Sequence, residues 1–185
     1  MTTDPQEHGG GHTLRHTVDQ RADGNVGMPR SIMIREQRRS RRIAMTPEER
    51  DDFLLEQRTC RLATVNATGP HLSAVWFVWD GDALWVSSIV KSQRFTDIQR
   101  DPRVSVMVDD GHDFGELRGI EIIGRAEVVG DVPRTGEVND ELVTPERLSG
   151  DKYSGGQFFY DGRHAWLRIV PEKFVSWDFR KMGTA

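Results

Sequence analysis

The stretch that decides the fold runs from residue 84 to residue 108 and reads LWVSSIVKSQRFTDIQRDPRVSVMV. Its first six residues alternate, which places Leu84, Val86 and Ser88 on one face and the intervening side chains on the other. A period of two residues is typical of a β-strand. The same alternation returns from Val104 to Val108, so the stretch begins and ends with a strand.

A short helix is predicted between these two strands, over residues 93–100. Ser92 is a suitable N-cap residue, and Phe95 and Ile98 lie one helical turn apart. Asp101-Pro102 ends the helix, because proline disfavours a helical conformation in the residue before it.

Hydroxyl and basic side chains gather at the start of this helix. A helix N-terminus offers free N–H groups and the positive end of the helix dipole, and both favour a bound phosphate. The side chains available there are Ser87, Ser88, Lys91, Ser92 and Arg94. An ordinary capped helix with solvated basic residues explains the same pattern, and the residues alone leave both interpretations open.

Composition indicates one folded domain with a tail. The chain has 185 residues, a hydrophobic share of only 36% and a net charge of −4, which gives no general sign of nucleic-acid binding. Its single cysteine, Cys60, excludes an internal disulfide and a cysteine-based metal cluster, and fits a reducing cytoplasm. With no apolar run long enough to cross a membrane and no signal-peptide core, we expect a soluble cytoplasmic protein.

Residues 1–44 are expected to form a disordered tail. Residues 1–29 are rich in Gly, Thr, Asp and His and have little to bury. His8, His12 and His16 would share a face of a helix, but Gly9–Gly11 disfavour that helix, so we predict no metal site. Residues 30–42 hold six arginines. Such an arm either binds a polyanion or is simply solvated, and its role stays open.

Residues 45–185 are expected to form the folded domain. Thr46-Pro47-Glu48-Glu49 predicts a capped helix that buries Phe53 and Leu54. Gly124, inside a long strand, suggests a bulge or a close backbone approach. The expected strands are 61–66, 71–79, 84–89, 104–108, 117–129, 165–170 and 173–178, the last two joined at Pro171-Glu172. Six or seven short strands with two or three helices predict an α+β fold that is mainly β, an antiparallel barrel decorated with helices.

Residues 131–163 interrupt the strand pattern. They are weakly helical, and Thr144-Pro145-Glu146-Arg147 repeats the capping pattern. Three aromatic residues, 158–160, follow Gly155-Gly156. They could form a lid over a planar ligand or a loop pinned onto the core, which is the commoner case.

Three separated motifs carry a family resemblance. The first motif begins with Ser87-Ser88 at a strand end and continues with Ser92-Gln93-Arg94, and Pro102 stands ten residues after Ser92. The second motif is Ile123-Gly124-Arg125. The third consists of Pro171, Lys173 and Trp177. From about Met45 to Trp177 the chain thus resembles the flavin-binding split β-barrel proteins of the pyridoxamine 5′-phosphate oxidase type. In that family the first triplet is Ser-Arg-Lys, the second motif is Glu-Gly-Arg, and arginine stands where Lys173 does.

The departures from the family pattern concern the substrate. The oxidase carries an arginine and a lysine on its second strand, where this chain has HLSAVWF at 71–77, and an Arg-Gln pair where this chain has Arg118-Gly119. These losses argue against oxidation of pyridoxamine phosphate. The triplet Ser92-Gln93-Arg94 and the short strand over residues 120–129 look closer to a sister branch of the family. Members of that branch bind the deazaflavin coenzyme F-420 and reduce conjugated organic molecules. Other relatives use FMN or bind haem.

The resemblance implies a homodimer with the cofactor in a groove between subunits. Arg94 would be the main phosphate anchor, with Lys91 as a second charge and neutral hydrogen bonds from Ser87, Ser88, Ser92 and Gln93. Backbone groups of Ala74, Val75 and Trp76 would run along the ring edge. The partner's Trp177 would border the ring, or Trp177 would simply pack in the barrel.

Two functions follow from this resemblance. The first is an oxidoreductase that transfers hydride from a reduced deazaflavin or FMN to a small conjugated acceptor. The alternative is a non-catalytic flavin- or haem-binding protein, for which His71, His112 and His164 are the axial ligands available outside the tail. No catalytic acid, base or nucleophile stands out in the sequence. This absence is compatible with a flavin or deazaflavin enzyme, because the cofactor carries the hydride chemistry. The acceptor and the choice of cofactor stay open.

Overall fold

The computed structural model describes residues 34–35, 37–38 and 40–183. The tail predicted over residues 1–29, with its three histidines, lies outside the described residues. Within the described part of the chain, no helix is long and apolar enough to cross a membrane.

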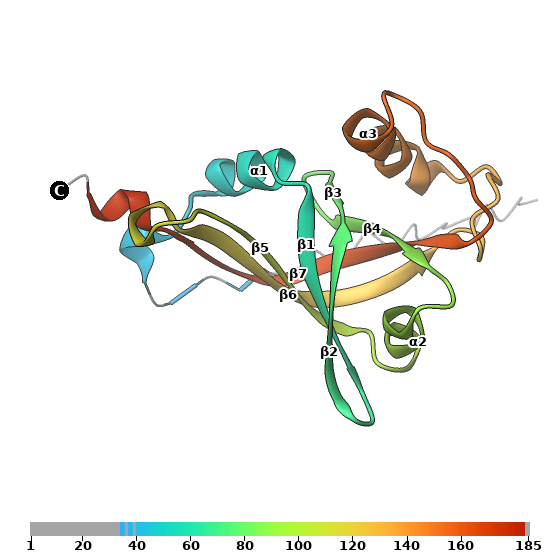
Figure 1. Ribbon diagram of the computed structural model, residues 1–185, viewed down its shortest axis with the longest axis horizontal. Helices are drawn as coiled ribbons and strands as arrows, with labels where there is room; N and C mark the ends of the chain where they lie inside the picture. The colour runs from blue at the N-terminus through green and yellow to red at the C-terminus, as the bar shows by residue number, and fades with distance from the viewer. Residues whose placement is uncertain (1–33, 36, 39, 184–185) are drawn as a thin grey trace, which may run out of the picture. The chain divides into compact units, whose positions relative to one another are not determined.

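A single antiparallel sheet of seven strands dominates the structure, in the order β2-β1-β5-β6-β7-β4-β3 (Figure 1). The strands are β1 (Thr59–Asn66), β2 (Gly69–Trp76), β3 (Val78–Trp79), β4 (Leu84–Ile89), β5 (Arg103–Asp110), β6 (Arg118–Val129) and β7 (His164–Asp178). The helices are α1 (Pro47–Glu56), α2 (Gln93–Arg100) and α3 (Val143–Tyr153), with 3-10 turns η1 (Arg41–Ile43), η2 (Phe114–Glu116), η3 (Asp140–Leu142) and η4 (Phe179–Met182). The mainly β half-barrel with three helices confirms the predicted fold class.

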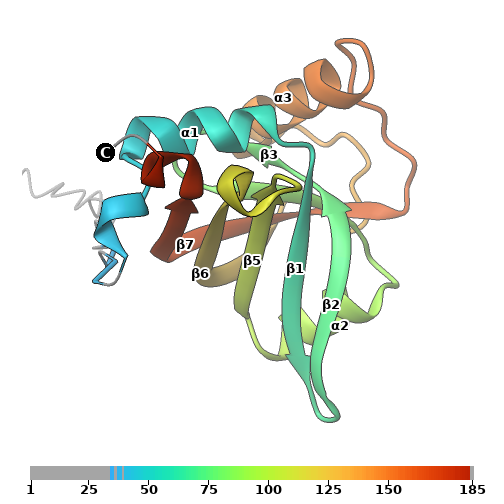
Figure 2. The same cartoon turned by 60° about the vertical axis from the view of Figure 1, so that its left-hand side comes forward.

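Two apolar clusters fill the two faces of the sheet. The larger one gathers inward side chains such as Leu62, Val86 and Ile122, all fully buried, and receives Phe53 and Leu54 from α1 as predicted. The smaller one contains Trp85 and Trp166 with Val78, Ala83, Val129 and Leu142. Because Trp85 and Val86 are neighbours on β4, the alternation of the strand assigns them to opposite faces. In Figure 2, α1 and α3 lie along the upper edge of the curved sheet.

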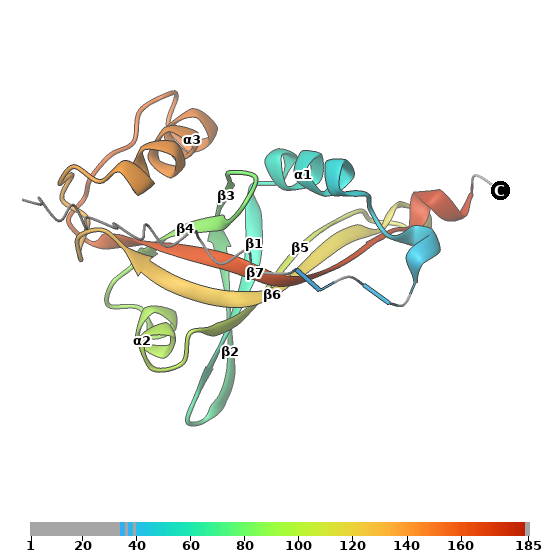
Figure 3. The ribbon, with the colours of Figure 1, turned by 180° about the vertical axis from the view of Figure 1, so that it is seen from behind.

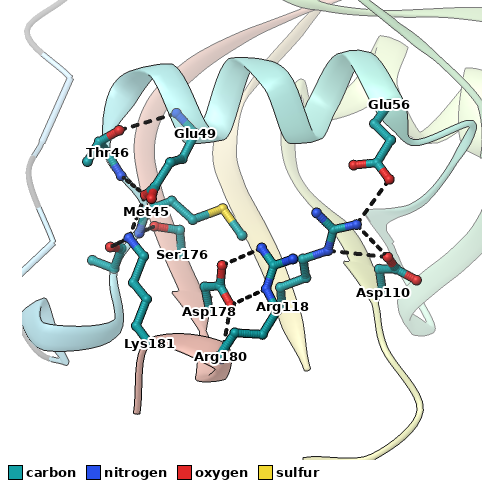
Figure 4. Close-up of polar contacts among 11 residues, drawn as sticks. Met45, Thr46, Glu49, Glu56, Asp110, Arg118, Ser176, Asp178, Arg180 and Lys181 are labelled. Carbon is teal, nitrogen blue, oxygen red and sulfur yellow. Dashed lines mark hydrogen bonds and ion pairs between the residues drawn. The ribbon is translucent and has the colours of Figure 1, made fainter. Parts of the chain in front are cut away.

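Helix α1 is capped and docked by polar contacts (Figure 4). The predicted capping box is confirmed, with Thr46 N donating to Glu49 Oε2 at 2.7 Å and Glu49 N donating to Thr46 Oγ1 at 3.2 Å. At the other end of the helix, Arg118 of β6 donates to Glu56 at 3.1 Å and to Asp110 at 2.8 Å. These contacts fix α1 over β5 and β6.

The prediction of one strand over residues 71–79 is wrong in one respect, because the structure has two strands there, β2 and β3. β2 pairs with β1, whereas β3 pairs with β4 at the other end of the sheet order. Phe77 separates them: its side chain is buried, and its N–H and carbonyl lie 3.2 Å and 2.6 Å from the Tyr153 hydroxyl. A hydroxyl from α3 thus satisfies the backbone groups that neither ladder can reach.

The two C-terminal strands predicted to join at Pro171-Glu172 are also wrong, since β7 is one strand of 15 residues. The pairing with β6 shifts register between Ile123 and Gly124, which lies opposite Pro171. Proline lacks the N–H that a regular ladder uses, so a bulge is where a strand accommodates it. The close approach predicted at Gly124 is confirmed, because a Cβ there would lie 2.2 Å from the Val170 carbonyl oxygen.

Two smaller differences concern chain segments outside the sheet. The cap predicted at Thr144 is wrong: α3 begins at Val143 after η3, whose cap is Asn139, accepting from Glu141 N at 3.0 Å. Before α1, Arg35 N donates to the Glu172 carbonyl at 2.9 Å. The described contacts with β7 therefore begin upstream of residue 45.

We predict that Gly124→Ala lowers the free energy of unfolding by about 1–3 kcal/mol, because the methyl group overpacks against backbone that cannot retreat. Gly115→Ala is the control, since nothing lies within 4 Å of a Cβ at that position. Urea denaturation of both variants measures the difference. Equal stability of the two variants would contradict the close approach.

Candidate functional site

The turn from β4 into α2 has the local structure that the sequence predicts. Ser92 is the N-cap: its Oγ accepts from Phe95 N at 3.3 Å and donates to the Ile89 carbonyl at 2.7 Å. The strand therefore leads directly into the first turn of the helix. The N–H groups of that first turn project from the end of the strand.

Arg94 is the main charge at this turn. Its Nε donates to Ser88 Oγ at 3.0 Å, and Ser88 is fully buried. Burial lowers the pKa of Arg94. Among the described residues, no carboxylate lies within ion-pair distance of Arg94. Most arginines on the strands, by contrast, have such a partner. Arg94 is thus a half-buried cation with no counter-ion in the part of the chain that the structure describes.

The other residues predicted for this site have different surroundings. Ser87 lies on the opposite face of β4 from Ser88, as strand alternation requires, and Lys91 is exposed. The Gln93 amide donates to Asp97 Oδ1 at 2.6 Å within the same helix. The structure therefore brings Ser88, Ser92 and Arg94 together at the turn, and turns Ser87 away from them.

Asp97 attaches α2 to the β1–β2 hairpin. It is fully buried and accepts from Thr64 Oγ1 at 2.9 Å as well as from Gln93, while His71 Nδ1 lies 3.8 Å away. Burial raises the pKa of this carboxyl, but the hydrogen bonds from Gln93 and Thr64 outweigh it and the pKa is lowered. The helix that carries Arg94 is thereby held in one position.

Strand β2 offers open backbone groups. It is the last strand in the order on its side, so its pairing with β1 uses only one of its two edges. The segment Ala74–Trp76 lies at its end, and along it Val75 is half-buried while Ala74 and Trp76 are exposed. An edge strand of this kind can hydrogen-bond a planar ligand.

A pocket of about 230 Å³ lies between α3 and the strands β3, β4 and β7. Ser87 of β4 lines this pocket, whereas the next residue, Ser88, bonds Arg94, so the pocket and Arg94 lie on opposite faces of the strand. In Figures 1 and 3, α3 and α2 lie on opposite sides of β4. Its lining is Trp76, Phe77, Val78, Trp85, Ser87, Ser149, Tyr153, Ser154, Phe158, Phe159, Asp161, His164 and Trp166.

Trp76 and Tyr153 form one wall of the pocket. Their rings stack with centroids 4.6 Å apart and an interplanar angle of 4°, and the Arg58 guanidinium lies 4.8 Å from the Tyr153 ring centroid. Burial raises the pKa of Tyr153 to about 12. Beside them, Lys152 lies over the Phe77 ring at 4.6 Å, and burial lowers its pKa to about 8. These α3 residues could not be singled out from the sequence, because the pattern of the segment is only weakly helical.

His164 and Asp161 form a hydrogen-bonded pair in the same pocket. Asp161 Oδ2 lies 2.7 Å from His164 Nδ1, and Asp161 Oδ1 accepts from the N–H groups of Arg163 and His164. The Arg163 amide and the His164 ring lower the pKa of Asp161. The sequence singled out His164 only as an ambiguous histidine and missed Asp161. The Asp161-Gly162-Arg163-His164 turn immediately before a strand was the available signal.

The segment that lines the pocket is pinned by Arg134. This buried arginine donates to Glu146 at 2.7 Å, and Glu146 also accepts from the Tyr160 hydroxyl at 2.7 Å and from Trp166 Nε1 at 3.3 Å. Phe158 packs on Trp166 with ring centroids 5.3 Å apart. The aromatic segment is thus a loop pinned onto the core, with Phe159 left 65% exposed at the pocket.

Trp177 lies far from these residues within one chain. It packs over Gly119 on the neighbouring strand. Ser87 pairs with Trp166, and Trp177 follows Trp166 by eleven residues on β7, which at about 3.3 Å per residue is about 36 Å. Trp177 and the β4–α2 turn can share a site only if two copies of the chain meet.

The chain belongs to the pyridoxamine 5′-phosphate oxidase family. The family model matches residues 46–178, which confirms the family resemblance. The conserved hypothetical protein Rv2991 from Mycobacterium tuberculosis has the same fold with a TM-score of 0.67 and 32% identity, over 80% of this chain and 93% of that one.

More distant structures carry varied descriptions. One described as an F420 reductase matches with a TM-score of 0.52 and 25% identity, over 68% of this chain and 94% of that one. HutZ, the heme storage protein from Vibrio cholerae, shares the fold with a TM-score of 0.56 and 20% identity, over 72% of this chain and 94% of that one. No curated protein matches the sequence significantly.

We predict that Arg134→Met lowers the free energy of unfolding by about 3–5 kcal/mol, because it removes a buried guanidinium and leaves two partly buried carboxylates without their partner. The control is Arg147→Met on α3, which removes an exposed pair with Asp151 at 3.3 Å and should cost at most about 1 kcal/mol. Chemical denaturation followed by tryptophan fluorescence compares the two. Similar losses in both variants would show that Arg134 does not pin the pocket segment.

Proposed function

We propose that this protein is an oxidoreductase that uses a reduced deazaflavin of the coenzyme F-420 type, or FMN, to reduce a small conjugated organic acceptor. The observation that carries the proposal is Arg94, a half-buried guanidinium at a helix N-terminus with no carboxylate partner among the described residues. An uncompensated charge in that position is stabilised by a bound anion. A cofactor phosphate is such an anion.

The residues present fit a flavin or deazaflavin phosphate. Arg94 would bind it in two hydrogen bonds, with Ser88, Ser92 and the first N–H groups of α2 beside it. Lys91 and Gln93 stand at the same turn and would add a charge and an amide. The backbone of Ala74–Trp76 would meet the ring edge. When bound, the cofactor supplies the hydride chemistry, and the chain supplies position and electrostatics.

The acceptor we propose is not pyridoxamine phosphate. A substrate phosphate needs cationic side chains near the ring edge, and β2 contains neither lysine nor arginine. The neighbouring pocket is walled by aromatic rings instead. Such walls favour a planar, weakly polar molecule. The alternative, a non-catalytic flavin or haem binder, would show a bound cofactor spectrum without turnover.

We also propose that the protein works as a homodimer. The outward faces of β1 and β2 expose apolar side chains, with Leu72 at 64% and Val65 at 46%. A grouped apolar surface on a sheet edge is typical of an interface. Within one chain Trp177 is too far from Arg94 to share a site with it. A second copy on this face could bring the partner's Trp177 close to Arg94.

Arg94→Ala should weaken the binding of FMN and of the deazaflavin by about 1.5–3 kcal/mol, the contribution of a charged hydrogen bond. Fluorescence or calorimetric titration of the purified full chain gives the affinity. Arg100→Ala is the matched control, because Arg100 is exposed in the last turn of the same helix. If both variants bind either cofactor as the wild type does, Arg94 is not the phosphate anchor.

Leu72→Glu should raise the dissociation constant of the dimer at least about tenfold, because burying an unpaired carboxylate costs well over about 1.4 kcal/mol. Sedimentation velocity across a concentration series measures it. Val138→Glu is the control, since Val138 is 92% exposed in a loop. A wild-type protein that sediments as a monomer, or a Leu72→Glu variant that dimerises normally, would rule out this interface.

A further inference from the structure

The pocket between α3 and β4 has the composition of a binding site for a small planar molecule. Tryptophan, tyrosine and phenylalanine rings make its walls, and its polar lining residues are three serines, Asp161 and His164. Its volume of about 230 Å³ is below the usual range of about 300–1,000 Å³ for ligand pockets. It therefore suits a compact molecule of one or two rings.

The pocket adjoins the edge where the cofactor ring is proposed to lie. Trp76 is the last residue of β2 and also lines the pocket. Its ring stacks on Tyr153 on one side and is still 60% exposed, so its other face is open to a second planar group. Ser87, at the centre of β4, is a further lining residue.

The polar end of the pocket is the His164–Asp161 pair. Asp161 is ionised, since its pKa is lowered, so it accepts the proton of His164 Nδ1 at 2.7 Å. Nε2 is then the ring nitrogen left for a ligand. In the imidazolium form Nε2 also carries a proton that can be donated to a ligand. Among the histidines that the structure describes, His71 and His112 do not line this pocket.

We propose that this pocket is the acceptor site, and that His164, oriented by Asp161, is the proton donor to the acceptor oxygen. The ligand class is a planar α,β-unsaturated carbonyl compound of one or two rings. This inference rests on the proposed function for the reductive step, but the recognition of the ligand rests on the pocket alone. His164 would be a catalytic residue and Asp161 a positioning residue.

The reaction balances with one hydride and one proton. When bound, the reduced flavin or deazaflavin would supply a hydride, with its two electrons, to the β-carbon of the acceptor and would itself be oxidised. The π electrons of the C=C bond move toward the carbonyl, and its oxygen becomes an enolate. The proton of His164 Nε2 moves to that oxygen, and the enol returns to the ketone. His164 then regains a proton from water.

The enolate is the state that the imidazolium recognises, so an enolate is the appropriate probe. The anion of 2-hydroxy-1,4-naphthoquinone is planar and negatively charged at neutral pH, whereas 1,4-naphthoquinone is a neutral molecule of nearly the same shape. Isothermal titration calorimetry of the full-length protein with each compound measures the preference for the anion. We expect wild type to bind the anion at least about tenfold more tightly, as a charged hydrogen bond provides.

His164→Gln should remove this preference and leave the affinity for the neutral quinone within about twofold, since the aromatic walls remain. His112→Gln is the matched control and should keep the preference. Asp161→Asn, which retains an oxygen for the two backbone N–H groups, should reduce the preference and provides the test if His164→Gln does not fold. Loss of turnover in both variants, with the deazaflavin or FMN still bound, is the expected kinetic result.

The outcomes separate the two proposals. If neither cofactor binds but the anion preference persists and depends on His164, the pocket assignment holds and the proposed function fails. If a cofactor binds but His164→Gln and Asp161→Asn bind both quinones as wild type does, the pocket assignment is overturned. Absence of quinone binding to the wild type also overturns it.

Discussion

The structure depends on one topological constraint: the first and last strands in the sheet order, β2 and β3, are consecutive in the chain and separated only by Phe77. A flat sheet cannot satisfy this connection, so the sheet must curl until its two ends meet. The Tyr153 hydroxyl satisfies the backbone of Phe77 at the junction. The same residue stacks on Trp76, and the closure of the half-barrel thereby creates a wall of the pocket.

The charges of the molecule divide into those with protein partners and those without. Arg134 and Arg118 each contact two carboxylates and hold a loop and a helix in place. Arg94 and Lys152 are half-buried, and burial lowers the pKa of each, yet within the described residues neither has a carboxylate partner. Paired charges of this kind serve the architecture, whereas a desolvated cation without a partner is a candidate for ligand binding. This contrast is the physical basis for placing the cofactor phosphate at Arg94.

Several features of the fold could be predicted because they are local. The alternation over residues 84–89, the cap at Ser92 and the capping box at Thr46 depend on neighbours within a few residues. The glycine at 124 could be interpreted because a glycine inside a long strand has few explanations. By contrast, the break at Phe77 had no sequence signal, since the residues around it are uniformly apolar and aromatic. The unbroken strand through Pro171 depends on a bulge at Glu172, which forms opposite Gly124, a residue 47 positions away from Pro171.

The sequence by itself determined the family, the strand-helix-strand element and the group of residues that meet at the start of α2. These follow from spacing and residue type along one short segment. Only the tertiary structure decided which face of β4 each serine takes, that Arg94 has no carboxylate partner in the described chain, and that Asp161 and His164 share a pocket with Trp76. The reason is that burial and pairing of charges are set by residues distant in sequence, and these are brought together only when the sheet closes.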